Sequence, residues 1–187
     1  FVAVKVAQFS FARLTGADPI LHVEMASTGE AACFGEDVEE AFLKGEIAVG
    51  GKFPKTGIFI SIGGEENKTR MLESLKLLRK LGLPIYATEK TAFFLARNGI
   101  QSKKVYKIHE RKSPNTLDLF QKHNVDLAIN LPDEAPLDGT DHYTIRRAAI
   151  DFNIPLYTNR QKAKLFIKAI TTKKLEDLLI KSWSEYA

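Results

Sequence analysis

The feature that most constrains the fold of this chain is an alternation of short apolar runs with longer amphipathic segments after Gly57. Short apolar runs indicate buried strands, and apolar residues spaced by three or four indicate helices. The expected strands are residues 58–62, 84–88, 104–108, 125–130 and 154–158. The expected helices are residues 67–81, 91–98, 114–123, 141–152 and 160–170. This succession predicts an α/β fold, a Rossmann-like three-layer sandwich whose five-stranded, mostly parallel sheet carries helices on both faces.

Boundary residues support several of these helices. Gly82 and Gly99 follow two of them, as expected of residues that end a helix in the left-handed conformation. Ser113 can cap the helix 114–123, with Pro114 at its first position. These signals place the helix ends within a few residues.

The two ends of the chain do not follow the alternation. Residues 1–35 mix short alternating runs with glycines and prolines, which predicts strands and loops without a core of their own. Asp37 can cap a helix that Gly50 and Gly51 end, and a connection follows it. Residues 175–186 predict a final amphipathic helix.

Composition limits the class of protein. A chain of 187 residues that is 44% hydrophobic can bury one good core and part of a second. The one cysteine, Cys33, allows no internal disulfide and favours a reducing compartment, so we expect a cytoplasmic protein. No secretory signal and no apolar run long enough for a bilayer is found, so no membrane partner is expected. The net charge is +4, but basic residues are scattered among acidic ones, so no nucleic acid partner is expected.

Polar residues gather where the expected strands end. Ligands of parallel sheets bind beyond the carboxyl ends of the strands. Thr88 and Thr91 flank the start of a helix, where unpaired N–H groups and a partial positive charge favour an anion. Lys107 and Asn130 end two further strands, and Lys68 lies on the first helix. Each residue alone also fits a structural role, since a threonine can cap a helix and an asparagine can form a turn, but together they predict an anion pocket.

Other kinds of site lack support in the sequence. The four histidines, including His142, are isolated from cysteines and carboxylates at ligand spacing, so no metal site is expected. The nucleophile elbow, the dinucleotide fingerprint and the Walker lysine pattern are absent, and no catalytic residue is assigned. Arg146 and Arg147 fall on an expected helix, where one should face solvent and the other can pair with a carboxylate.

Several motifs resemble those of one enzyme family. Residues 16–30 read GADPILHVEMASTGE and resemble a signature, G-(A/V)-D-P-x-L-x-x-E-M-x-S-T-G-E, at the end of the second ATP-grasp domain of the carbamoyl-phosphate synthetase large chain. The rest resembles the carboxy-terminal allosteric domain of that chain, which has the methylglyoxal synthase-like fold. The motifs that carry this likeness are YAT-x-x-TA at 86–92, V-x-K-x-HE at 105–110, DLAIN at 126–130 and Y-x-IRR-A-A at 143–149. The resemblance covers essentially the whole chain.

The resemblance implies a division into three parts. Residues 1–35 would be the C-terminal tail of the preceding ATP-grasp domain, 36–56 a helix and linker, and 57–187 the methylglyoxal synthase-like regulatory domain. The parent would be an ATP-dependent ligase that makes carbamoyl phosphate for pyrimidine and arginine synthesis. ATP and Mg²⁺ would serve the parent, with no cofactor and no catalysis in this part. Expected partners are the rest of the large chain, a glutaminase subunit and a possible second copy.

The resemblance also implies a ligand. Regulatory domains of this family bind UMP or IMP in bacteria, and UTP with phosphoribosyl pyrophosphate, or N-acetylglutamate, in animals. Carried over by position, the phosphate-binding residues are Lys68, Thr88, Thr91, Lys107 and Asn130. These are the residues that the strand ends already indicate.

Some positions depart from the family pattern. Leu131 and Pro132 follow Asn130 where bacterial members have two threonines. Members that bind N-acetylglutamate have tryptophan at the position of Lys107 and asparagines at those of Asp133 and His142, so that effector is disfavoured. Of the residues that serve ornithine in bacteria, Thr158 is present, while Val6 and Leu156 replace a glutamate and a tyrosine.

The alternative function is a free-standing methylglyoxal synthase-type phosphate lyase. In that family an aspartate in a Gly-Gly-Asp segment after the third strand supplies the base. The corresponding residues here, 109–116, read HERKSPNT and contain no such aspartate. Which effector binds, and whether it activates or inhibits, stays open.

Overall fold

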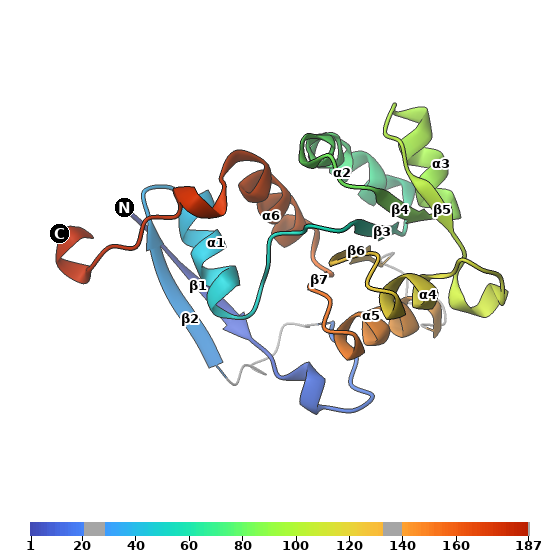
Figure 1. Ribbon diagram of the computed structural model, residues 1–187, viewed down its shortest axis with the longest axis horizontal. Coiled ribbons are helices and arrows are strands. Elements are labelled where there is room, and N and C mark those ends of the chain that lie inside the picture. The colour runs from blue at the N-terminus through green and yellow to red at the C-terminus, as the bar shows by residue number, and fades with distance from the viewer. Residues whose placement is uncertain (21–28, 133–139, 187) are drawn as a thin grey trace.

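The main sheet has five parallel strands in the order β5-β4-β3-β6-β7 (Figure 1). It belongs to a computed structural model that describes residues 1–20, 29–132 and 140–186. The strands are β3 (Ile58–Ile62), β4 (Ile85–Thr88), β5 (Lys103–Val105), β6 (Leu127–Leu131) and β7 (Leu156–Tyr157). The chain builds outward from β3 to β5 and then returns to the other side of β3, which makes β3 and β6 the switch point. The predicted α/β fold class is confirmed.

Helices cover both faces of this sheet, as predicted. On one face lie α2 (Glu65–Leu77), α3 (Glu89–Arg97) and α6 (Arg160–Thr172), and their apolar residues form one cluster with β3, β4 and β6. On the other face lie α4 (Thr116–Gln121) and α5 (Thr140–Asp151). The central strand β3 is buried along its whole length, so its sequence IFISI is apolar on both sides. Phe59 meets Phe120 of α4 edge to face at 5.4 Å, and truncating either ring to alanine would cost about 3–5 kcal/mol.

Several boundaries differ from the sequence-based prediction. The first helix starts at Glu65 rather than 67, since Gly64 with φ 70° turns the chain directly from β3 into α2. Ser113 is not the cap of α4: Asn115 is, accepting from the Asp118 N–H at 3.0 Å. The expected strand 104–108 ends at Val105, and a short 3-10 turn, η3 (Ile108–Glu110), replaces its second half. The α2 segment does continue through η2 (Leu78–Leu81) to the predicted stop at Gly82.

The N-terminal part forms a hairpin of β1 (Val2–Gln8) and β2 (Gly29–Gly35), covered by α1 (Val38–Ala48). Asp37 caps α1 as predicted, since its carboxylate accepts from the Glu40 N–H at 2.9 Å. At Gly45 a Cβ would lie 2.6 Å from Val6, so glycine lets α1 approach β1 closely. Val6 joins the same hydrophobic cluster as β3 and α6, so the hairpin shares the core of the main sheet.

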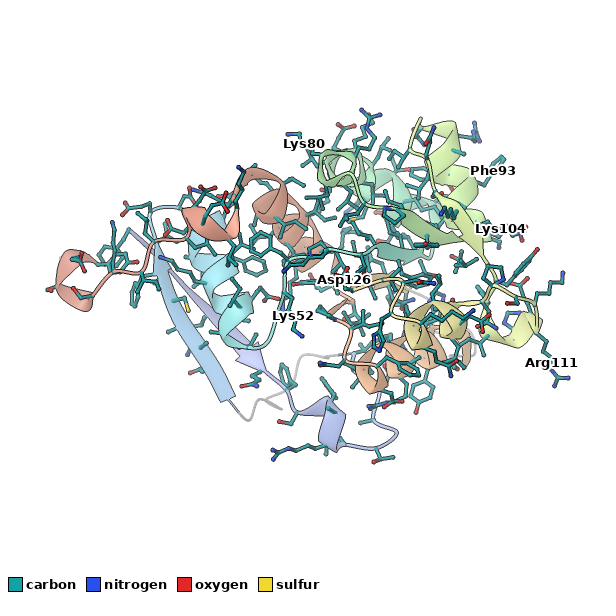
Figure 2. All side chains as sticks on the ribbon, viewed as in Figure 1. Lys52, Lys80, Phe93, Lys104, Arg111 and Asp126 are labelled. Carbon is teal, nitrogen blue, oxygen red and sulfur yellow. The ribbon has the colours of Figure 1, made fainter. Side chains whose placement is uncertain are left out.

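The connection from α1 to β3 is fixed at the amino end of the sheet. Asp126, labelled in Figure 2, accepts from the backbone N–H of Lys55 at 2.7 Å and of Gly57 at 3.3 Å. One carboxylate at the start of β6 therefore sets where β3 begins. No helix in the described ranges is both long and apolar enough to cross a membrane.

The predicted final helix at 175–186 is wrong. The structure has two short 3-10 turns, η4 (Leu175–Asp177) and η5 (Trp183–Tyr186), with extended chain between them. Asp177 and Glu185 each accept from a backbone N–H three residues earlier, so each starts its own turn. The segment also contacts β2, since the Tyr186 hydroxyl donates to the Phe34 carbonyl at 3.2 Å. These contacts outweigh the helical pattern of the segment.

Candidate functional site

The strand register brings the predicted site residues to one edge of the sheet. Asn130 of β6 lies beside Ser61 of β3, and Thr88 of β4 lies beside Val105 of β5. The Thr88 hydroxyl donates to the Ser61 hydroxyl at 3.2 Å. This bond links β4 to β3, so Asn130, Ser61 and Thr88 form a row across three neighbouring strands. Lys107 follows Val105 by two residues. The row therefore places an amide and two hydroxyls side by side where parallel strands end.

Two threonines sit at the start of α3. Thr88 holds the N-cap position, but its side chain caps no backbone N–H of the helix. The Thr91 hydroxyl instead accepts from the Ile62 N–H at 3.0 Å and lies 3.4 Å from the Thr88 hydroxyl. Both threonines are buried, at 5% and 1% exposure. The first turn of α3 thus keeps the positive end of its dipole free of a capping oxygen from Thr88, which suits an anion.

The start of α2 lies against the same edge. The Asn67 side chain donates to the Pro132 carbonyl at 3.2 Å, and the Gly63 N–H donates to the Leu131 carbonyl at 2.8 Å. These two bonds tie the first turn of α2 to the end of β6. Lys68, one residue further on, lies in the same first turn of α2.

Lys68 is buried, and its charge is balanced by a carboxylate in solvent. The Lys68 Nζ lies 2.5 Å from Glu65 Oε1, with 4% of the lysine side chain exposed against 80% of the glutamate. The hydrogen bond and charge of Lys68 lower the pKa of the Glu65 carboxyl. A buried ammonium needs a counter-charge, and an exposed side chain can move aside for another anion. Glu65 therefore stands where an external anion could bind Lys68.

Asn130 is fully buried and has a buried arginine beside it. Arg146 Nη1 donates to Asn130 Oδ1 at 3.5 Å, and Asn130 Nδ2 lies 3.4 Å from His142 Nδ1. Because a guanidinium has donors alone, the amide oxygen must face Arg146, and the amide NH₂ faces His142. His142 and Arg146 are four residues apart on α5, so both lie on one side of that helix.

Lys107 is half-buried at the start of η3. Its backbone N–H donates to Glu110 Oε1 at 2.9 Å, which fixes the turn. Around this turn the exposed side chains include Lys104, whose ammonium lies 5.1 Å from the Tyr106 ring centroid, and Arg111 (Figure 2). The β5 end of the edge is therefore strongly basic.

Three residues of this site were not among the predicted binding residues. Ser61, the next-to-last residue of the fully buried strand β3, was expected at this edge from the strand pattern but was given no role. The spacing of His142 and Arg146, four residues apart on a predicted helix, is visible in the sequence. Their proximity to Asn130 is not visible there. The expectation for the arginine pair was half right: Arg146 pairs with Asp18, but Arg147 pairs with Asp151 at 2.7 Å instead of facing solvent alone. Asp133 and most of the motif at 16–30 lie outside the described residues.

The arrangement offers donors and positive charge, which is the chemistry of anion binding. Across the described ranges no group of three or more histidines, cysteines or carboxylates could hold a metal ion. The carboxylates nearest in sequence to η3 serve the backbone: Glu110 accepts from the Lys107 N–H and Asp118 from the Asn115 N–H at 2.9 Å.

Comparison with known proteins identifies the class of domain in this chain. Residues 70–158 match the MGS-like domain. A crystal structure of methylglyoxal synthase from Elizabethkingia anophelis NUHP1 is similar at a TM-score of 0.48 and 15% identity, covering 72% of this chain and 95% of that one. The chain carries an MGS-like domain.

Similarity to longer proteins shows in which kind of protein such a domain occurs. The chain is 44% identical over 181 residues to multifunctional protein URA2 of Saccharomyces cerevisiae, covering 91% of this chain. It is 40% identical over 181 residues to the mitochondrial carbamoyl-phosphate synthase [ammonia] of Homo sapiens, covering 95% of this chain. It is thus homologous, over nearly its whole length, to a part of each of these proteins. The chain spans 8% of the length of the first and 12% of the second.

Proposed function

We propose that this chain is the allosteric domain of a carbamoyl-phosphate synthetase large chain and binds a phosphorylated effector such as UMP or IMP. The observations that carry the proposal are the row of Asn130, Ser61 and Thr88 beside the start of α3, and the buried Lys68 in the first turn of α2. Oriented hydroxyls, an amide and point charges are what a phosphate group requires. The five effector residues are Lys68, Thr88, Thr91, Lys107 and Asn130.

The homology to a carbamoyl-phosphate synthase supports the identity of the parent protein. In this proposal the parent makes carbamoyl phosphate with ATP and Mg²⁺ for pyrimidine or arginine synthesis, in the cytoplasm. Residues 1–35 are the tail of its preceding ATP-grasp domain, and 36–56 join that tail to the regulatory domain. The partners are the remainder of the large chain and a glutaminase subunit, and a second copy can also take part. An effector alters the distant ATP site only by preferring one of two domain arrangements.

Calorimetric titration of the 187-residue chain tests the site. The ligands are UMP, IMP, UTP, phosphoribosyl pyrophosphate and N-acetylglutamate. We expect at least one phosphorylated ligand to bind, and Lys107→Ala to weaken it about 10- to 100-fold, because a charge-assisted bond to phosphate is lost. Lys122→Ala is the matched control, since Lys122 is exposed at the end of α4, away from the carboxyl edge.

Three outcomes would contradict the proposal. Absence of heat with every phosphorylated ligand would mean that the pocket does not bind phosphate. Binding of N-acetylglutamate alone would mean that Lys107 does not have the role assigned to it. Equal weakening by Lys107→Ala and Lys122→Ala would show that net charge, rather than the site, determines affinity.

A further inference from the structure

Side chains of α5 hold an N-terminal segment, residues 11–18, against the main domain. The Tyr143 hydroxyl donates to the Gly16 carbonyl at 2.8 Å. Arg147 Nη1 lies within hydrogen-bonding distance of three backbone carbonyls of the segment, at 3.1 to 3.2 Å, namely those of Phe11, Leu14 and Ala17. The segment is therefore fixed to a helix that is more than a hundred residues away in the sequence.

Arg146 joins this contact to the candidate effector site. Its Nε donates to Asp18 Oδ1 at 2.7 Å and its Nη2 to Asp18 Oδ2 at 2.5 Å, a bidentate ion pair. Its Nη1 points the other way, to the buried Asn130 amide. The arginine side chain is 4% exposed, whereas that of Asp18 is 38% exposed. One buried guanidinium thus bonds the 11–18 segment on one edge and the site on the other.

The two edges of this guanidinium are not equally engaged. Charge-assisted hydrogen bonds are usually about 2.7–2.9 Å long, which the contacts to Asp18 match or undercut. The contact to the neutral Asn130 oxygen is 3.5 Å and weak. An anion seated beside Asn130 would offer this edge a charged partner in a buried setting, where Coulomb interactions are strong.

We propose that an anionic effector beside Asn130 binds the Nη1 edge of Arg146 and repels the Asp18 carboxylate, with which it then shares one positive charge, so that effector binding loosens the 11–18 segment. The inference rests on the proposed function, since it requires an anion at that site. Linkage makes the effect reciprocal: if the anion weakens the hold of Arg146 on Asp18, then removing the Asp18 charge strengthens anion binding. The 11–18 segment is thereby the first part of the N-terminal region to respond to the effector.

The test uses Asp18→Asn in the 187-residue chain, with UMP and UTP titrated in parallel. Asp151→Asn is the matched control, because Asp151 pairs with the neighbouring Arg147 on the same helix but not with Arg146. We expect Asp18→Asn to bind the nucleotide about fivefold more tightly or better, and Asp151→Asn to bind as the wild type does. Asp18→Glu restores the carboxylate and should return the affinity toward that of the wild type.

Hydrogen exchange provides a second readout that a merely structural role would not move. The N–H groups of Leu14 and Ala17 donate to carbonyls within the segment, and that of Arg13 donates to the adjacent Ser10, so all three report on its order. In the wild type, saturating nucleotide should speed their exchange. In Asp18→Asn they should exchange quickly with and without nucleotide, and circular dichroism shows whether that variant is folded.

The outcomes separate this inference from the proposed function. If the wild type binds nucleotide but Asp18→Asn binds it equally or more weakly, the coupling of the anion to Asp18 through Arg146 is refuted and the effector site stands. The same conclusion follows if nucleotide leaves the exchange of 11–18 unchanged in the wild type. If the wild type binds neither nucleotide, the effector site itself is refuted, and the inference with it.

Discussion

Lys68 carries its charge inside the protein, while the carboxylate that balances it lies in solvent. This asymmetry is absent from a second pair on α2, Lys76 with Glu73 at 2.7 Å, in which 42% and 83% of the side chains are exposed. A buried cation keeps much of its electrostatic force, whereas an exposed pair is screened by water and salt. Lys68 is therefore the residue at which an external anion gains most by replacing an internal one.

Removing the charge of Glu65 should raise the affinity for phosphate. Glu65→Gln frees the Lys68 ammonium from its competing carboxylate, and we expect UMP or UTP to bind about two- to fivefold more tightly. Titration at low and high salt measures this, and the gain should shrink as salt rises. Glu73→Gln makes the same chemical change beside Lys76, and an equal gain there would show that only net charge matters.

At the scale of the element, helix starts decide where several side chains point. Asn115 and Asn159 cap α4 and α6, and Asp37 caps α1. Asp37 also pairs with Lys173, which follows α6, so this cap ties the start of α1 to the end of α6 at 2.6 Å. The pKa of Asp37 is lowered first by its bond to Lys173 and then by the Glu40 N–H. The charged carboxylate is thus the form that stabilises the fold.

Asp37→Ala should destabilise the protein by about 1–2 kcal/mol at neutral pH. Since the folded pKa is lowered, the stabilisation is fully present above the ordinary aspartate value of 3.8 and is lost as pH falls through the folded value. Urea unfolding should therefore show that the difference in free energy of unfolding between Asp37→Ala and the wild type shrinks as pH falls below 3.8 and through the folded pKa.

A neutral cap provides the control for this prediction. Asn159 accepts from the Lys162 N–H at 3.0 Å and does not titrate, so the cost of Asn159→Ala should stay constant with pH. A cost of Asp37→Ala that is equally constant would contradict the assigned role of the charge.

At the scale of the whole molecule, several polar contacts join the N-terminal part to the main domain, and the Arg146 pair with Asp18 is one of them. Another is made by Glu46 of α1, which is 4% exposed and accepts from the Tyr157 hydroxyl of β7 at 2.8 Å. Lys162 Nζ of α6 lies 2.9 Å from the second carboxylate oxygen. Burial, followed by the charge of Glu46, raises the pKa of Tyr157 well above its ordinary value, so the phenol stays a donor.

Tyr157→Phe should cost about 1.5–3 kcal/mol, because the buried Glu46 carboxylate loses its donor. Urea unfolding measures the loss, which should appear as one cooperative transition since hairpin and sheet share a core. Tyr143→Phe removes the same hydroxyl from an exposed bond to the Gly16 carbonyl and should cost much less. If the two variants lose equal free energy of unfolding, the buried bond from Tyr157 to Glu46 stabilises the protein no more than the exposed bond from Tyr143 does.

The boundaries that the sequence predicted well are those with local causes. The Asp37 cap, the stop at Gly82 and the apolar strand 58–62 depend on residues near them in the chain, so their patterns are readable. Ser113 was misread although the competing cap, Asn115, makes an equally local bond to the Asp118 N–H. The segment 175–186 was misread because Tyr186 bonds Phe34 of β2, a distant contact that a local pattern does not contain. Thr88, Thr91 and Asn130 were found because parallel strands must end at a common edge.

The sequence by itself determined the alternating strands and helices, and with them the edge at which polar side chains collect. Only the tertiary structure decided which partners those side chains have. Arg146 and Asp18 are 128 residues apart, and no periodicity links them. A buried charge is satisfied by whatever group the fold brings within reach, so its partner depends on packing across the whole chain. That is why the sheet edge and its polar residues could be predicted from the sequence, while the contact of Arg146 with the N-terminal segment could not.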